Sequence, residues 1–207
     1  MNFLQSRFYS QLIQFSDYIF LSILWVICSI PLITLVPATI SLFSVVRSWK
    51  NGTSHGIFTL FFSEFKQQLL KKILMSFSLL AFLAVIYRDT RMVMPIENQT
   101  KFFLFFLLSI AFFLVVSALV HYFNLFVRAE EKNITTICKN TLILIVSQFH
   151  WTFIGVMVIC LASLLILFIP MMIFILGSFT TYILIQISDK ALRNIHVKQQ
   201  SIEARGL

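Results

Sequence analysis

The sequence predicts an all-α integral membrane protein with five transmembrane helices and interfacial amphipathic helices on the cytosolic side. Its 207 residues are 59% hydrophobic and only 12% charged, with a mean hydropathy of +0.92. A soluble domain carries about a quarter charged residues. The apolar residues also gather in four uncharged runs, 19–46, 73–87, 102–127 and 142–188. Uncharged runs of this length are typical of membrane-spanning helices.

The first run, Ile19–Val46, is too long for one straight helix. Its 28 residues would extend about 42 Å, against a hydrocarbon core of about 30 Å. Pro31 and Pro37 are the places for a break, and Pro37 is suited to begin a new helical segment. We therefore expect a span over 17–36 and a short interfacial helix over 38–49. The alternative is one proline-kinked span.

The middle of the chain predicts two more spans, each reached through an interfacial helix. Phenylalanines at helical spacing, with the charged and polar residues Glu64, Lys66 and Gln67 on the other side, predict an amphipathic helix over 56–68. Lys72, just beyond it, is expected to extend outward to the headgroups. The second span is expected over 69–87 and the third over 102–127. The segment 134–149 then predicts another interfacial helix.

The last run contains more than one span. From Trp151 to Ile187 there are 37 residues without a charge, about 55 Å as a single helix. Pro170 divides them into segments 151–169 and 171–187, each just long enough to cross a bilayer.

The distribution of basic residues tests this division and predicts the orientation. Five spans place 12 Lys and Arg residues on one side of the membrane and 4 on the other, whereas one span over 151–187 gives 8 and 8. Basic residues concentrate on the cytosolic side of membrane proteins. We therefore expect a multi-pass protein of the cell membrane with its N-terminus outside and its C-terminus in the cytoplasm. The basic face is expected to contact anionic lipid headgroups, and no nucleic-acid partner is expected.

His121, Asn124 and Arg128 form the best candidate polar cluster. They follow one another at a spacing of one helical turn near the cytosolic end of the third span. A functional interpretation makes them a contact for a lipid headgroup or a small anion. The alternative is a structural role, in which His121 and Asn124 bond to a neighbouring helix.

Small residues on the last two spans predict helix packing. Gly155 and Ala162 are seven residues apart on one face of the fourth span, and Gly177 and Ser178 are adjacent on the fifth. Small residues allow helices to approach closely in a membrane. Packing within the chain is a better explanation of them than dimerisation.

No motif for a reaction is recognisable. The sequence has no HExxH or CxxC spacing and no glycine-rich phosphate loop. Its three cysteines have no paired spacing. We therefore expect no catalytic residue, no cofactor and no metal, and hence a protein that is not an enzyme.

The stretch "PATISLFSVVRSWKNG" resembles the YesL-like bacterial membrane family, a domain of unknown function. The residues that carry the resemblance are Pro37, Ala38, Thr39, Arg47 and Trp49. The stretches "FFSEFKQQLLKKIL", "HYFNLFVRAE" and "FIPMMIFILGSFTTYILIQI" agree with it. The sequence departs from the family pattern at Asn124, where a proline is expected.

The resemblance implies a small multi-pass protein of no established activity. Genes of the family often lie beside those of sugar-uptake transporters, two-component sensors and glycan-degrading enzymes. We therefore expect a non-catalytic accessory or regulatory protein linked to carbohydrate uptake, with transporter or sensor subunits as partners. The main alternative is a small permease, acting alone or as an oligomer, for a sugar or related solute. A membrane enzyme acting on lipid-linked sugar would have only histidines as candidate catalytic groups.

Overall fold

The computed structural model describes residues 3–52, 56–95, 100–128 and 134–203, and regular structure in them is helical. The long helices are α1 (Phe3–Ser29), α2 (Leu35–Lys50), α4 (Leu69–Val93), α5 (Thr100–Arg128), α7 (Phe149–Phe168) and α8 (Ile173–Glu203). The shorter ones are α3 (Ile57–Lys66) and α6 (Ile134–Ser147), with 3-10 turns η1 (Leu32–Thr34) and η2 (Pro170–Met172). The all-α class is confirmed. The described residues contain six stretches long and apolar enough to cross a membrane, as expected of a multi-pass membrane protein.

The first predicted span is interrupted at Pro31 rather than at Pro37. The α1 helix ends at Ser29 and α2 begins at Leu35. Proline lacks the N–H that an uninterrupted helix would need at residue 31, and it disfavours helical geometry in the residue before it. The hydroxyl of Thr34 lies 2.7 Å from the carbonyl oxygens of both Cys28 and Pro31 and can donate its one hydrogen to either, so it pairs a backbone oxygen that the break exposes.

Pro37 lies in the first turn of α2, where its missing N–H costs no helical hydrogen bond. The N–H of Val36, which has no partner within the helix, donates to the hydroxyl of Ser76 on α4 at 3.3 Å. Pro37 therefore belongs to the beginning of α2, as the sequence indicates, but the helix break precedes it by six residues.

The α2 helix is the centre of the bundle. It contacts α1, α3, α4, α5 and α8, and buried side chains occur on all its sides: Val36, Pro37, Ala38, Ile40, Ser41, Leu42, Phe43, Ser44, Val45 and Val46. The sequence predicts an interfacial helix over 38–49 with a serine stripe opposite its apolar face. The structure instead packs both faces against other helices. The apolar stretch Leu32–Lys50 contains this helix. It is the stretch that raises the number from the five predicted spans to six.

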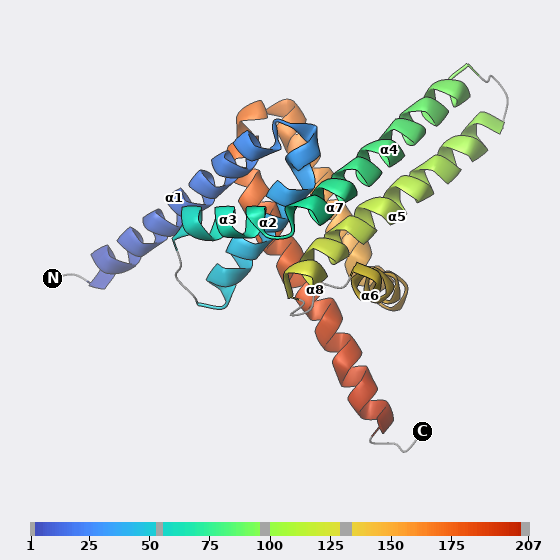
Figure 1. Ribbon diagram of the computed structural model, residues 1–207. Coiled ribbons are helices and arrows are strands. Elements are labelled where there is room, and N and C mark those ends of the chain that lie inside the picture. The colour runs from blue at the N-terminus through green and yellow to red at the C-terminus, as the bar shows by residue number, and fades with distance from the viewer. Residues whose placement is uncertain (1–2, 53–55, 96–99, 129–133, 204–207) are drawn as a thin grey trace.

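The first and last helices run antiparallel and place both described ends of the chain at one end of the bundle (Figure 1). Ser22 on α1 contacts Ser178 on α8. One turn before Ser22, the ring centroid of Tyr18 lies 6.2 Å from that of Tyr182, which is one turn after Ser178. Tyr18 is also 5.0 Å from Trp49 at the end of α2. The predicted placement of the two termini on opposite sides of a membrane is therefore not confirmed.

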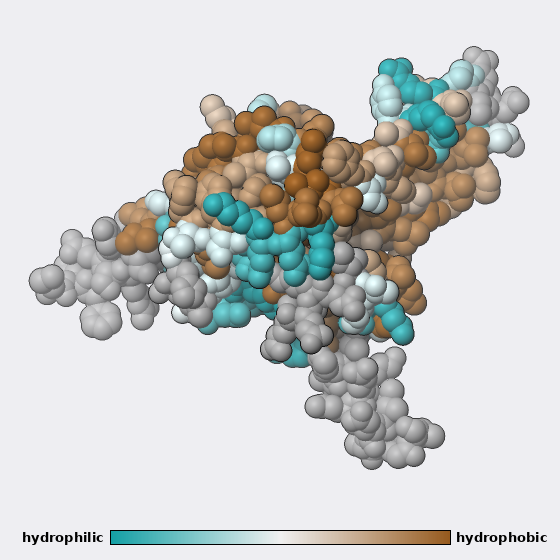
Figure 2. All heavy atoms as spheres, in the orientation of Figure 1, coloured by the Kyte–Doolittle hydropathy of each residue, from teal (hydrophilic) through white to brown (hydrophobic). Residues whose placement is uncertain are grey.

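The α4–α5 hairpin extends away from the other helices (Figure 1), and its polar tip includes Arg88, Asp89 and Arg91. Figure 2 shows hydrophilic side chains at this tip and on the lower part of the bundle, with a broad hydrophobic surface between them. The short helices α3 and α6 lie across the direction of α4 and α5 (Figure 1). Their boundaries are close to the predicted 56–68 and 134–149.

Candidate functional site

Asp189 lies at the centre of an ion cluster that joins three helices. Its Oδ2 accepts a hydrogen bond from Nζ of Lys50 at 2.7 Å. Its Oδ1 lies 3.4 Å from a guanidinium nitrogen of Arg47 and 3.6 Å from one of Arg128. Lys50 and Arg47 belong to the last turn of α2, Arg128 ends α5, and Asp189 lies within α8. The Asp189 cluster, meaning these four residues, therefore ties the C-terminal ends of α2 and α5 to α8.

Asn124 extends the cluster into the interior. Its Oδ1 accepts a hydrogen bond from the Arg47 guanidinium, and its side chain is only 1% exposed. Since Arg47 can only donate, this bond fixes which amide atom faces it. The amide nitrogen of Asn124 has no hydrogen-bond partner among the described residues. Asn124 thus holds the buried side of Arg47, while Asp189 neutralises the outer side.

Charge in this cluster is unbalanced. Three cations surround one carboxylate, and Arg47 is only 12% exposed whereas Lys50 and Arg128 are 31% and 37% exposed. Removing cations from water is costly unless they are paired and hydrogen-bonded. Asp189 and Asn124 supply that pairing for Arg47, and the surplus positive charge lies on the more exposed Lys50 and Arg128.

His121 ties α5 to α7 and α8. Its side chain is 1% exposed. Nε2 lies 2.9 Å from the hydroxyl of Thr152, and Nδ1 lies 3.3 Å from the hydroxyl of Ser188. Both ring nitrogens therefore contact hydroxyl groups that can donate or accept, which satisfies a neutral imidazole in either tautomer. This geometry suits a structural histidine that connects three helices.

The three residues of the predicted polar cluster act on different helices. His121 contacts α7 and α8, Asn124 contacts α2, and Arg128 contacts α8. Their shared face of α5 is thus a contact surface for the rest of the bundle. The interpretation in which His121 and Asn124 bond to neighbouring helices agrees with this geometry.

Comparison with known proteins addresses the resemblance directly. The model of the family described as "Protein of unknown function, DUF624" matches residues 18–90. The chain is 25% identical over 193 residues to "Uncharacterized protein YesL" of Bacillus subtilis (strain 168), and the match covers 89% of each chain. The resemblance to the YesL-like family is confirmed. No solved structure matches the chain.

The YesL-like motif places its residues at both ends of α2. Near the beginning, the hydroxyl of Thr39 accepts a hydrogen bond from the indole of Trp25 on α1 at 3.2 Å, and Ala38 is fully buried. At the other end, Arg47 enters the Asp189 cluster and Trp49 stacks edge-on against Tyr18. The motif residues therefore hold the central helix at its two ends. The departure from the family pattern at Asn124 lies in an uninterrupted α5, where the amide binds Arg47.

The predicted packing residues lie between helices. A Cβ added at Gly177 would be 3.2 Å from the Trp25 ring and 3.3 Å from the Ser22 hydroxyl. Ser22 donates to the hydroxyl of Ser178 at 2.8 Å and accepts from its backbone N–H at 2.9 Å. A Cβ added at Gly155 on α7 would be 3.7 Å from Leu184. These small residues thus lie where α8 meets α1 and α7.

Ala162 is partly buried. It borders a largely apolar cavity of about 280 Å³ that also touches Trp25, Thr39 and Gly177. Ala162 is therefore on the inner side of α7, although it is not at a tight helix contact.

Sequence reasoning missed Asp189 and misplaced Lys72. Asp189 follows an apolar run, and a lone acid just after a span is a usable signal, because a partly buried acid generally requires a cation.

Lys72 is fully buried rather than extended outward. Its ammonium lies 5.8 Å from the centre of the Phe126 ring and donates to the carbonyl of Glu64. Among the described residues, no group of three His, Cys, Asp or Glu is placed to hold a metal ion.

Proposed function

We propose that this YesL-like chain is a non-catalytic accessory or regulatory protein of the bacterial cytoplasmic membrane, linked to carbohydrate uptake. The Asp189 cluster is the observation that carries the proposal. Its charged groups bind one another and fix helices, and a basic end surrounds them, as suits a scaffold that presents a surface to a partner. The carbohydrate link rests on the family resemblance.

Co-purification tests the accessory role. The tagged full-length chain would be isolated from cells grown with and without a sugar that induces uptake, beside an unrelated tagged membrane protein. Transporter or sensor subunits should be enriched with the tagged chain alone, and loss of the exposed cations Lys139 and Arg193 should reduce their recovery. Changing Arg88 at the opposite end should leave recovery unaltered. Repeated recovery of no such subunit would contradict the proposal.

We also infer a topology with six membrane-crossing helices and both termini in the cytoplasm. The antiparallel α1–α8 contact and the turn between α1 and α2 support this arrangement over five spans. It leaves Arg88, Arg91 and Lys101 outside, and the other thirteen of the sixteen basic residues on the cytosolic side. This asymmetry exceeds the 12 to 4 division of the five-span arrangement, and therefore accords better with the positive-inside rule.

Reporter fusions distinguish the two topologies. Alkaline phosphatase, which is active only outside the cytoplasm, and a fluorescent protein, which reports the cytoplasm, would be fused in turn at the N-terminus, after residue 95 and at the C-terminus. We expect phosphatase activity at residue 95 alone. An N-terminal fusion that reports the outside would restore the five-span arrangement.

The apolar cavity of about 280 Å³ among α1, α2, α5, α7 and α8 supports a second candidate, the small permease. Space at membrane depth beside a broken helix is a feature of many transporters. Flux of labelled sugars into proteoliposomes, compared with empty liposomes, tests it. Flux no greater than in the empty liposomes would contradict the permease.

A further inference from the structure

A second cavity, of about 440 Å³, lies between α1, α2 and α8 at the end of the bundle that carries the Asp189 cluster. Three aromatic side chains, Tyr18, Trp49 and Tyr182, form much of its lining. Tyr18 and Trp49 have ring centroids 5.0 Å apart at an interplanar angle of 76°, and Tyr18 and Tyr182 are 6.2 Å apart at 78°. Rings turned across one another in this way present both faces and edges to the space beside them.

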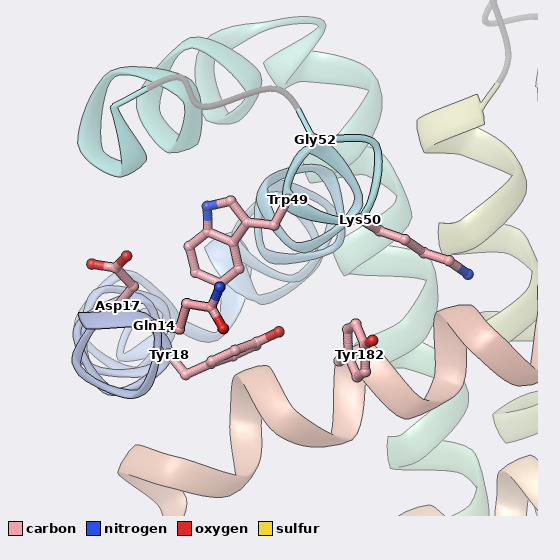
Figure 3. A pocket seen from close by; sticks show the side chains of 7 residues that line it. All are labelled: Gln14, Asp17, Tyr18, Trp49, Lys50, Gly52 and Tyr182. Atoms are coloured by element: carbon pink, nitrogen blue, oxygen red, sulfur yellow. The ribbon is translucent and has the colours of Figure 1, made fainter. Parts of the chain in front are cut away.

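Opposite charges lie on the two sides of these rings. Figure 3 shows Asp17 on one side and Lys50 reaching away on the other, with the amide of Gln14 between Trp49 and Tyr18. Among the described residues, Asp17 forms no hydrogen bond and no ion pair. Lys50 is bound to Asp189, but the cluster contains two cations more than carboxylates. The cavity therefore has a carboxylate on one side and an aromatic middle, while the ammonium of Lys50 is directed out of it, toward Asp189.

The position of the cavity matches the interface of a membrane. Trp49 and Lys50 are the last two residues of α2, and tryptophan, tyrosine and lysine at helix ends typically lie at the level of lipid headgroups. An aromatic ring beside a carboxylate attracts an organic ammonium group. A surplus of lysine and arginine attracts a phosphate.

We propose that this cavity binds a phosphoethanolamine group, the headgroup of a zwitterionic phospholipid. The phosphodiester lies at the edge of the cavity, on the side of the Asp189 cluster with its surplus positive charge. The primary ammonium lies over the rings of Tyr18 and Trp49, toward Asp17. The same chemistry could come from a membrane lipid or from a soluble phosphoethanolamine ester. This site does not depend on the accessory role proposed above.

A titration of the full-length chain in detergent tests the site. The ligands are a short-chain phosphatidylethanolamine, a phosphatidylglycerol with the same acyl chains, and glycerophosphoethanolamine. Tryptophan emission and melting temperature are the two readouts. The ethanolamine lipid should act at a concentration at least ten times lower than the glycerol lipid. Asp17→Asn should remove this difference, whereas Asp89→Asn, in the α4–α5 tip, should keep it. Trp49→Phe should abolish the emission change.

The outcomes separate the possible sources. If glycerophosphoethanolamine acts as well as the lipid, the site takes a soluble ester, and if only the lipid acts, the site takes a membrane lipid. Equal responses to the two lipids in the wild-type protein would overturn the proposal. A preference for ethanolamine that survives in Asp17→Asn would overturn it as well.

Discussion

Asp189→Asn is the substitution that most directly tests the ion cluster. It replaces the one carboxylate that the described residues place among Arg47, Lys50 and Arg128 by a neutral amide of similar size. The three cations, at 3.4, 2.7 and 3.6 Å from the carboxylate in the wild type, would then repel one another without compensation. Arg47 would be affected most, because it is the least exposed of the three.

The expected cost lies between two limits. Breaking a buried ion pair by removing one partner costs about 3–5 kcal/mol, whereas an exposed pair contributes about 0–1 kcal/mol. Asp189 is 19% exposed and Lys50 31%, so solvent screens part of the interaction. We expect a loss of about 2–3 kcal/mol in the free energy of unfolding. For a chain of this size that corresponds to roughly 5–10 °C in melting temperature.

Thermal unfolding of the purified protein in one detergent measures this loss. Asp89→Asn is the matched control, because it removes an exposed carboxylate beside Arg88, which is 68% exposed. It should shift the melting temperature by no more than about 2 °C. Arg128→Gln should also be mild, since Asp189 keeps two cations. The double variant Asp189→Asn/Arg128→Gln should be more stable than Asp189→Asn alone, because fewer unbalanced cations remain. If Asp189→Asn melts within 1 °C of the wild type, the cluster does not hold the helices together.

Two further substitutions test the contacts between helices. Gly177→Ala should destabilise the protein by about 1–3 kcal/mol, because its Cβ would lie 3.2 Å from the Trp25 ring. Gly155→Ala, with a Cβ in ordinary contact at 3.7 Å, should be neutral or stabilising by up to about 1 kcal/mol. A Gly177→Ala melting temperature equal to that of Gly155→Ala would contradict the close α1–α8 contact. His121→Leu should lower the free energy of unfolding by about 1–3 kcal/mol, because the Ser188 hydroxyl loses its partner. An unchanged melting temperature would show that the hydrogen bonds of His121 do not stabilise the protein.

The sequence predicts the helices well because the physics that defines them is local. Apolar runs, charged boundaries and the break at Pro170 set most helix ends within a few residues, but the predicted first span over 17–36 runs through Pro31, where the structure interrupts it. The direction that the chain takes after Pro31 is not decided by the local sequence. A proline indicates that a helix ends, but contacts with α8 decide whether the next helix continues across the membrane or turns back. The sequence therefore predicts the approximate boundaries of α2 but not the helices that surround it.

The candidate site shows the same contrast between local features, which the sequence predicts, and contacts between distant residues, which it does not. His121, Asn124 and Arg128 could be selected from the sequence because polar residues at one-turn spacing near a span end are unusual. Their partners are distant in sequence. Asn124 meets Arg47 across 77 residues, and Arg47 meets Asp189 across 142. No periodicity within one helix predicts such pairs. The sequence signals that Asp189, a lone acid after an apolar run, needs a cation, but not which one.

The burial of α2 explains why one short stretch carries so much of the family resemblance. A helix surrounded by five others cannot change a side chain on any face without affecting a neighbour. Its two ends are constrained by polar contacts: Val36 meets Ser76 at one end, and Arg47 meets Asp189 and Asn124 at the other. Unpaired polar groups are costly among apolar helices, so these contacts fix the position of α2 within the bundle. The motif can therefore be understood as a structural requirement of the central helix.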